Sequence, residues 1–226
     1  NMTYRQIINS VLRRLREDSI TSDWAGPLIE VAADTPTDYQ IMMGDFINEV
    51  KREVEDAWDW TSLRTLVTVP TVANQKSYTI TGSSQRSRML SVQDQTTGGI
   101  LQSVPDKWLR ETQYPTQSSS GPPSYYSINS VSNGVLQAQL YPTPNAAWNV
   151  DFYMVNPQPS LTLAVTELKC PDLPVIMGTW ARAIAERGED GGSLSDMAQM
   201  QYQQSLSDAI QQDVGRHSSE VVWYGS

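Results

Sequence analysis

The sequence contains one cysteine, Cys170, and one histidine, His217, among its 226 residues. A single cysteine cannot form a disulfide within the chain, which suits assembly in a reducing compartment. Hydrolytic triads need a base held beside a nucleophile, and zinc sites use three or four Cys, His or carboxylate ligands. Cys170 precedes Pro171 and His217 lies in a polar stretch, so we expect a buried thiol and an exposed imidazole. The sequence therefore predicts no catalytic centre, no metal site and no cofactor.

Positive charge is also scarce. The chain has 16 Lys and Arg residues against 25 Asp and Glu residues, a net charge of −9. This excess of negative charge repels phosphate, so we expect a surface past which DNA slides rather than one that binds it. The one basic turn, Arg13, Arg14 and Arg16, is interpreted as a protein-facing or solvated patch, with nucleic-acid contact as the alternative. No apolar run approaches the ~20 residues that span a bilayer.

Helical periodicity is present toward both ends of the chain. Thr3 to Gln6 and Thr37 to Gln40 each have the sequence of a capping box, followed by apolar residues at spacings of three and four. The same period resumes after Pro171 and again after Ser193, which is predicted to cap the last helix. Four helical segments of this kind predict a small bundle. The apolar positions of the last two include Leu173, Ile176, Met177, Trp180, Ile184, Leu194, Ala198, Tyr202, Leu206 and Ile210.

Between these helical segments the apolar period changes to two, beginning at Leu66. Short alternating segments are separated by turn sequences, of which Thr97-Gly98-Gly99 and Ser132-Asn133-Gly134 predict hairpins. Short strands at this spacing predict an antiparallel β-sandwich or barrel-like domain inserted into the bundle, and therefore an α+β fold. The predicted domains are residues 1–65 and 167–214 for the two halves of the bundle, 66–166 for the β-domain and 215–226 for an extended tail.

Trp58 and Trp60 lie where the helical period gives way to the strand period. Tryptophans can stack on sugars or bases, but at such a junction they more often wedge two packed parts together. We therefore predict that both are interdomain packing residues.

Four carboxylates of the helix that precedes this junction lie opposite its apolar stripe. Paired carboxylates can act in glycoside hydrolysis, but charge on the wet face of a helix is ordinary. We interpret these four residues as a solvated face. They are Asp45, Glu49, Glu53 and Asp56.

The tail ends in an abruptly apolar group after a polar spacer. Val221, Val222, Trp223 and Tyr224 are predicted to bind a partner's groove or sheet edge, a mode in which aromatic residues dominate the binding energy. The alternative is that the tail has no fixed structure.

Four segments, in their order and spacing, carry a resemblance to a known family. They are TYRQIINSVLRRL, FINEVKREVEDAWDW running into LVTVPTVANQKSYTIT, LQAQLYPTPNAAWNVDFYM, and ELKCPDLPVIMGTWARAIAERGED followed by MAQMQYQQSLSDAI. With them the chain resembles, from about Met2 to Val214, the head-to-tail adaptor proteins of tailed bacteriophages, a group that includes podovirus tail tubular protein A and related connector proteins.

This resemblance implies a structural role in the virion, with no enzymatic activity and no cofactor. It implies a self-assembled ring, a dodecamer, between the portal protein and the tail nozzle protein, with DNA passing through the lumen without specific binding. The helical bundle would face neighbouring subunits and the β-domain would face the tail. The protein would be made in the host bacterial cytoplasm, with no membrane partner. By analogy, Gly215 to Ser226 would reach toward the portal or an adjacent subunit.

Two other functions remain open from the residues alone. The β-domain could bind glycans or a host surface protein on a helical scaffold, through Trp108, Tyr114, Tyr125 and Tyr126. The chain could instead be a cell-wall hydrolase that uses Glu49 or Glu53.

Overall fold

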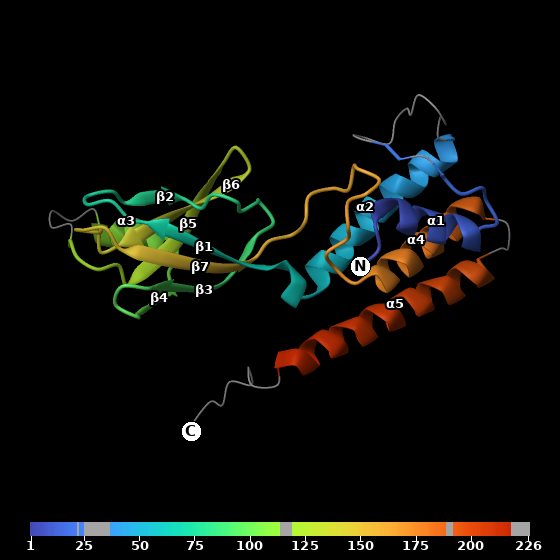
Figure 1. Cartoon of the computed structure of the whole chain (residues 1–226). Helices are drawn as coiled ribbons and strands as arrows, with labels where there is room; N and C mark the ends of the chain where they lie inside the picture. Colours follow the sequence, from blue (N-terminus) through green and yellow to red (C-terminus); the bar gives the residue numbers. More distant parts are fainter. Residues whose placement is uncertain (22, 25–36, 114–118, 189–191, 218–226) are drawn as a thin grey trace, which may run out of the picture. The chain divides into compact units, whose positions relative to one another are not determined.

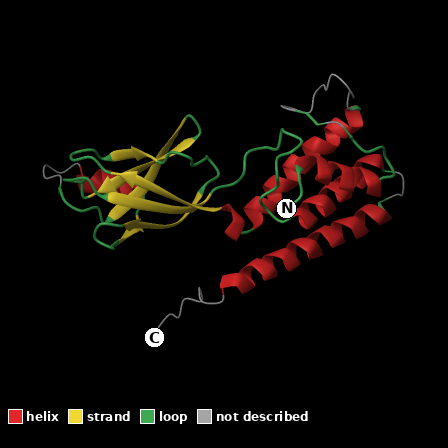
Figure 2. Cartoon of the chain, viewed as in Figure 1, coloured by secondary structure: helices red, strands yellow, loops and turns green. Residues whose placement is uncertain are grey.

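The computed structural model describes residues 1–21, 23–24, 37–113, 119–188 and 192–217. These residues form two compact units. The helical unit combines Asn1–Ser62 with the segment that begins at Gln158, and the β unit is Leu63–Pro157. Figure 1 labels the elements of both units and Figure 2 colours them by type. The α+β class predicted from the sequence is confirmed, with helices in one unit and a barrel-like sheet in the other.

Four α-helices build the helical unit, as the periodicity predicts. They are α1 (Tyr4–Arg14), α2 (Asp38–Ala57), α4 (Asp172–Arg187) and α5 (Ser193–Val214), with short 3-10 helices η1 (Thr61–Leu63) and η2 (Gly215–His217). Both capping boxes are present: the Gln6 amide donates to Thr3 Oγ1 at 3.4 Å, and the Gln40 amide donates to Thr37 Oγ1 at 3.2 Å. In each box the threonine amide in turn donates a hydrogen bond to the glutamine Oε1. These local bonds fix where α1 and α2 begin.

The start of α5 differs from the prediction. Ser193 is the first helical residue and not the cap; Gly192 occupies the N-cap position with φ +100°, and no side chain caps the helix. A serine side chain would cap well, but the chain between α4 and α5 turns through a positive φ that glycine adopts without strain. The backbone turn, and not the side-chain cap, therefore sets the start of this helix.

Helix α4 is the centre of the helical unit, because it packs against α1, α2 and α5. The helices approach closely at Gly178, where an added Cβ would lie 2.6 Å from Val50 Cγ1 and 3.0 Å from ring carbons of Tyr202. Only a residue without a side chain allows the three helices to meet there. The fully buried side chains around this centre include Ile7, Ile8, Leu12, Met43, Ile47 and Trp60.

The segment that re-enters the helical unit after Pro157 is held by buried polar contacts. Lys51 and Glu55, both almost fully buried on α2, form an ion pair of 2.9 Å. The Gln158 amide donates to Glu55 at 3.0 Å, and Lys51 donates to the Gln158 carbonyl. Farther along, the Leu161 amide donates to Asn48 Oδ1 at 2.7 Å. The domain division predicted from the sequence placed residues 158–166 in the β-domain, whereas these contacts hold Gln158 and Leu161 in the helical unit.

The β unit is one seven-stranded sheet in the order β1-β7-β3-β4-β5-β6-β2, together with helix α3 (Asp106–Gln113). Both predicted hairpins are present, β3 with β4 and β5 with β6. The strands are β1 (Arg64–Pro70), β2 (Ser77–Thr79), β3 (Arg88–Asp94), β4 (Ile100–Ser103), β5 (Tyr125–Ser132), β6 (Val135–Tyr141) and β7 (Asn149–Val155).

One strand pair departs from the antiparallel prediction: β4 and β5 are parallel. Parallel neighbours need a crossover between them, and here the chain from β4 to β5 carries α3. The other pairs are antiparallel, and alternate residues of β6 are buried, as period-two patterning predicts. The core of this unit is Tyr78, Ile80, Val92, Leu101, Tyr126, Leu136, Ala138, Leu140, Val150, Phe152 and Met154.

Among the described residues, no helix combines the length and apolar character that crossing a bilayer requires.

Candidate functional site

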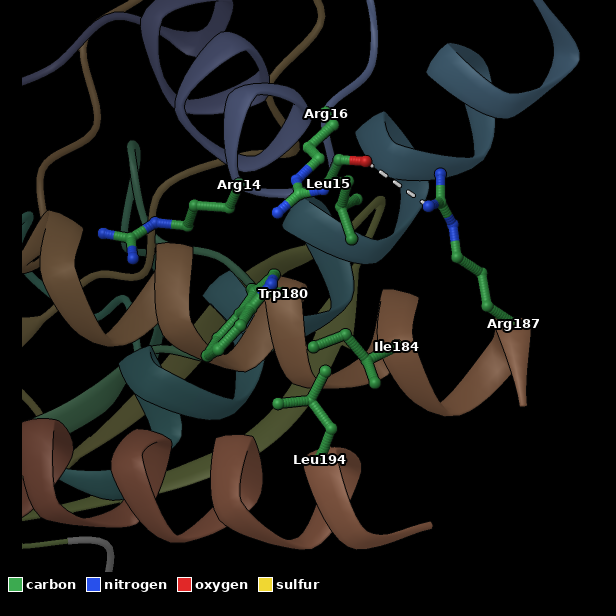
Figure 3. A pocket seen from close by; sticks show the side chains of 7 residues that line it. All are labelled: Arg14, Leu15, Arg16, Trp180, Ile184, Arg187 and Leu194. Carbon is green, nitrogen blue, oxygen red and sulfur yellow. Dashed lines mark hydrogen bonds between the residues drawn. The ribbon is translucent and has the colours of Figure 1, made fainter. Parts of the chain in front are cut away.

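A pocket of about 360 Å³ opens in the helical unit where the end of α1 meets α4 and α5 (Figure 3). Its apolar floor is Trp180 and Ile184 from α4 and Leu194 from α5. Its remaining lining consists of Arg14, Leu15, Arg16 and Arg187. A concave apolar surface with several polar groups at its edge is the ordinary form of a binding site.

The backbone at the end of α1 sets the position of Arg16. The Glu17 amide donates to the Leu12 carbonyl at 2.9 Å, and the Arg16 amide donates to the Arg13 carbonyl at 3.2 Å. This is the Schellman pattern, in which the residue after the C-cap adopts the left-handed conformation that glycine favours. Here that residue is Arg16, with φ +60°. A non-glycine residue at this φ is strained by about 1 kcal/mol or more, and such strain concentrates at functional positions.

Arg187 forms one wall of the pocket, and its guanidinium contacts three other residues. Its Nε donates to the Tyr39 hydroxyl at 2.9 Å, its guanidinium lies 4.9 Å from the centroid of the same ring, and it pairs with Glu17. It also donates to the Leu15 carbonyl at 3.4 Å, the bond drawn in Figure 3. Burial acts to lower the pKa of Arg187, but the hydrogen bonds with Tyr39 and Glu17 outweigh burial and raise it. Arg187 therefore braces α4 against α1 and α2.

Arg14 and Arg16, unlike Arg187, are exposed at the pocket. Both side chains are exposed, and neither has an ion-pair or hydrogen-bond partner for its guanidinium among the described residues. Figure 3 shows them above the floor formed by Trp180, Ile184 and Leu194. The pocket therefore joins two positive charges, unpaired within the part of the chain that the structure describes, to an apolar surface.

A second pocket, of about 200 Å³, lies beside the end of α5 and includes Trp60, Cys170 and Asp213 in its lining. Trp60 is buried, and its indole donates to the Val54 carbonyl at 2.6 Å. The Trp58 indole donates to Asp213 Oδ2 at 3.2 Å. These contacts lie within the helical unit, and interdomain packing by both tryptophans stays a prediction.

Three of the groups considered for catalysis are buried or paired. Burial, and secondly the nearby Glu55 carboxylate, raises the pKa of the Cys170 thiol to about 12, so the thiol is protonated at neutral pH. Glu49 and Glu53 both pair with the Arg182 guanidinium. Within the described ranges, no group of three or more His, Cys, Asp or Glu residues is placed to hold a metal ion.

The aromatic residues of the β unit separate into core and surface. Tyr126 is buried in the core against Phe152. Trp108 is 38% exposed, with ring centroids 5.3 Å from Tyr125 and 5.9 Å from Tyr141. Tyr114 lies outside the described residues, as do Val221, Val222, Trp223 and Tyr224. The aromatic set predicted for glycan binding is thus divided, because Tyr126 faces the core.

The sequence indicates the basic turn but not the pocket. Arg14 and Arg16 are identifiable as part of a protein-facing or solvated patch, whereas Trp180, Ile184 and Leu194 appear only as members of apolar stripes. Arg187 has no sequence signal beyond its position in the last turn of a helix, where cations are ordinary.

Comparison with known families gives one match. The chain matches the family model described as SU10 adaptor protein over residues 2–223, which include both units. No curated protein matches the chain.

Proposed function

Because this chain belongs to the SU10 adaptor protein family, a family of phage head-to-tail adaptors, we propose that it forms a ring between the portal protein and the tail nozzle protein of the virion. The observation that carries the proposal is the family match over residues 2–223, since it includes the β unit and all four helices of the helical unit. The ring is a homo-oligomer, a dodecamer, assembled from protein made in the host cytoplasm. DNA passes through its lumen.

The charge of the chain supports passage of DNA rather than binding. With nine more negative than positive charges, the protein repels the phosphate backbone at long range. The exposed basic turn is too small to reverse that repulsion, because tight non-specific binding requires many neutralised phosphates. DNA can therefore slide past without being held.

A structural role without catalysis agrees with the described chemistry. The Cys170 thiol is buried and protonated, and the two carboxylates considered for hydrolysis share Arg182. A general acid must lie within hydrogen-bond distance of a bound substrate, whereas both of these carboxylates are paired with one guanidinium. We infer that the protein has no enzymatic activity.

The test is assembly with the portal. Purified protein should form rings of one size in electron micrographs and bind the portal of its own phage, with the portal of an unrelated phage as the control. Sedimentation velocity of the protein alone measures its self-association. If the protein associates with neither its portal nor itself, the proposal is wrong.

One observation favours a second candidate, the binding of glycans or a host surface protein by the β unit. Trp108 is exposed and is packed against Tyr125 and Tyr141, which gives sugars an aromatic surface on which to stack. Glycan-array binding by the full chain that is lost in Trp108→Ala and kept in Ile100→Ala would support it. Ile100 is the matched control because it is 74% exposed in the same unit, outside this cluster. If the chain binds no glycan on the array, glycan binding is wrong and only a host surface protein is left as the ligand of this second candidate.

A further inference from the structure

The pocket of Figure 3 has the chemistry of a site for a particular kind of peptide. Its floor of Trp180, Ile184 and Leu194 would cover an apolar side chain. Its two exposed cations, Arg14 and Arg16, would pair with a carboxylate next to that side chain. The occupant is thus expected to carry an acidic residue followed closely by large apolar residues.

The chain's own last residues meet this requirement. Glu220 is followed directly by Val221, Val222, Trp223 and Tyr224. We propose that the pocket receives residues 220–224 of a second copy of the chain, with Trp223 on the apolar floor and Glu220 beside Arg14 and Arg16. This inference rests on the self-association proposed above and names the contact that produces it.

Chain length excludes the segment of the same copy. Leu194 lies at the start of α5 and Val214 at its end, which at 1.5 Å per residue are about 30 Å apart. The six residues from His217 to Trp223 span at most about 20 Å when fully extended. Because the described chain ends beyond the end of α5 that is remote from Leu194, this length is too short to reach the Leu194 floor of the same copy.

A contact of this kind is consistent with a ring. The tail of one copy and the pocket of the next are different surfaces, so the contact is heterologous, and heterologous contacts generate closed rings where the rotation between copies closes. The Schellman end of α1 places the Arg16 side chain at the rim, where the acidic residue would arrive.

Cross-linking between two full-length variants tests the proposal. Leu194→Cys places a thiol in the pocket, and Gly225→Cys places one just after the apolar residues without removing any of them. The native thiol of Cys170 is buried and should not react. When the two variants are mixed and oxidised, a disulfide-linked dimer is expected, and neither variant alone should give it. Met200→Cys is the matched control for Leu194→Cys, because it is an exposed α5 position outside the pocket lining.

Charge reversal gives a readout that simple proximity would not. Glu220→Arg in the Gly225→Cys chain should lower the yield of linked dimer about fivefold, which corresponds to roughly 1 kcal/mol of ion pairing. Arg14→Glu with Arg16→Glu in the Leu194→Cys chain should restore it. A yield equal to that of the Met200→Cys control, or one insensitive to Glu220→Arg, overturns the inference.

Sedimentation of the same mixture separates this inference from the ring proposal. Oligomers without the cross-link would overturn the tail-in-pocket contact and leave the adaptor ring intact. If neither forms, both proposals fail. A cross-link that appears only within one chain carrying both cysteines would also overturn the inference, because it would mean that the segment reaches its own pocket.

Discussion

Trp58 and Asp213 are joined by a hydrogen bond of 3.2 Å from the indole to Oδ2, although 155 residues separate them in the chain. The same oxygen accepts from the Thr61 amide at 3.0 Å and from the Thr61 hydroxyl at 3.1 Å. A buried aspartate near a helix C-terminus is disfavoured by the helix dipole, so these bonds must offset that cost. Asp213 therefore fixes the end of α5 to the residues that follow α2.

Replacement of Asp213 should destabilise the helical unit. Asp213→Ala leaves the half-buried donors of Trp58 and Thr61 without this acceptor, so we expect a loss of about 1–3 kcal/mol in the free energy of unfolding. Urea denaturation followed by circular dichroism measures it. Asp208→Ala is the matched control, an exposed aspartate of the same helix, and should change stability by no more than about 0.5 kcal/mol. Equal losses in the two variants would contradict the assignment.

Gly178 should not accept even one added carbon. Gly178→Ala would place a Cβ 2.6 Å from Val50 Cγ1, and the resulting overpacking of α4 against α2 and α5 should cost about 1–3 kcal/mol. Gly215→Ala serves as the control, because a Cβ there meets nothing within 4 Å and its φ of −61° is ordinary. Thermal unfolding of both variants measures the difference. A Gly178→Ala protein as stable as the control would show that the helices shift apart without cost.

Features determined by neighbouring residues were predictable from the sequence. The capping boxes that begin with Thr3 and Thr37 are bonds between residues three apart, so they can be identified in the sequence alone. The hairpin turns were predictable for the same reason. The prediction that Ser193 caps α5 was wrong for an equally local reason. The N-cap position is occupied by Gly192 in a positive-φ turn, and this turn sets where α5 begins.

Features that join distant segments could not be predicted. The parallel pairing of β4 with β5 depends on the path of the chain through α3, which alternation does not reveal. The pocket brings Arg16 together with Trp180 and Leu194, residues that share no spacing pattern. The fold class thus follows from periodicity, whereas the candidate site follows only from packing.

The buried pair of Lys51 and Glu55 predicts a contrast between single and double replacements. Lys51→Met alone leaves a buried carboxylate without its cation and should cost about 3–5 kcal/mol. Lys51→Met with Glu55→Gln removes both charges but keeps an acceptor for the Gln158 amide, so it should recover most of that loss. Urea denaturation of the three proteins measures both effects. A double variant no more stable than the single variant would indicate that the pair contributes by more than charge balance.

The thiol of Cys170 predicts how stability depends on alkaline pH. Burial, and secondly the Glu55 carboxylate, raises its pKa from an ordinary value near 9 to about 12, so the native protein keeps the proton where the unfolded chain releases it. The contribution of this group is therefore complete below pH 9 and is lost as the pH rises from 9 toward 12. Tyr202, whose pKa is raised to about 12 by burial and then by Glu53, acts in the same direction above pH 10.

Urea denaturation between pH 7 and pH 10 should show unfolding free energy that falls above pH 9. Cys170→Ala should lower the slope between pH 9 and 10 by up to about 1.4 kcal/mol per pH unit, whatever the cost of the missing sulfur at neutral pH. Because the comparison is between slopes, a packing defect cannot imitate it. Identical slopes for the two proteins would mean that the thiol ionises as readily in the native state as in the unfolded chain.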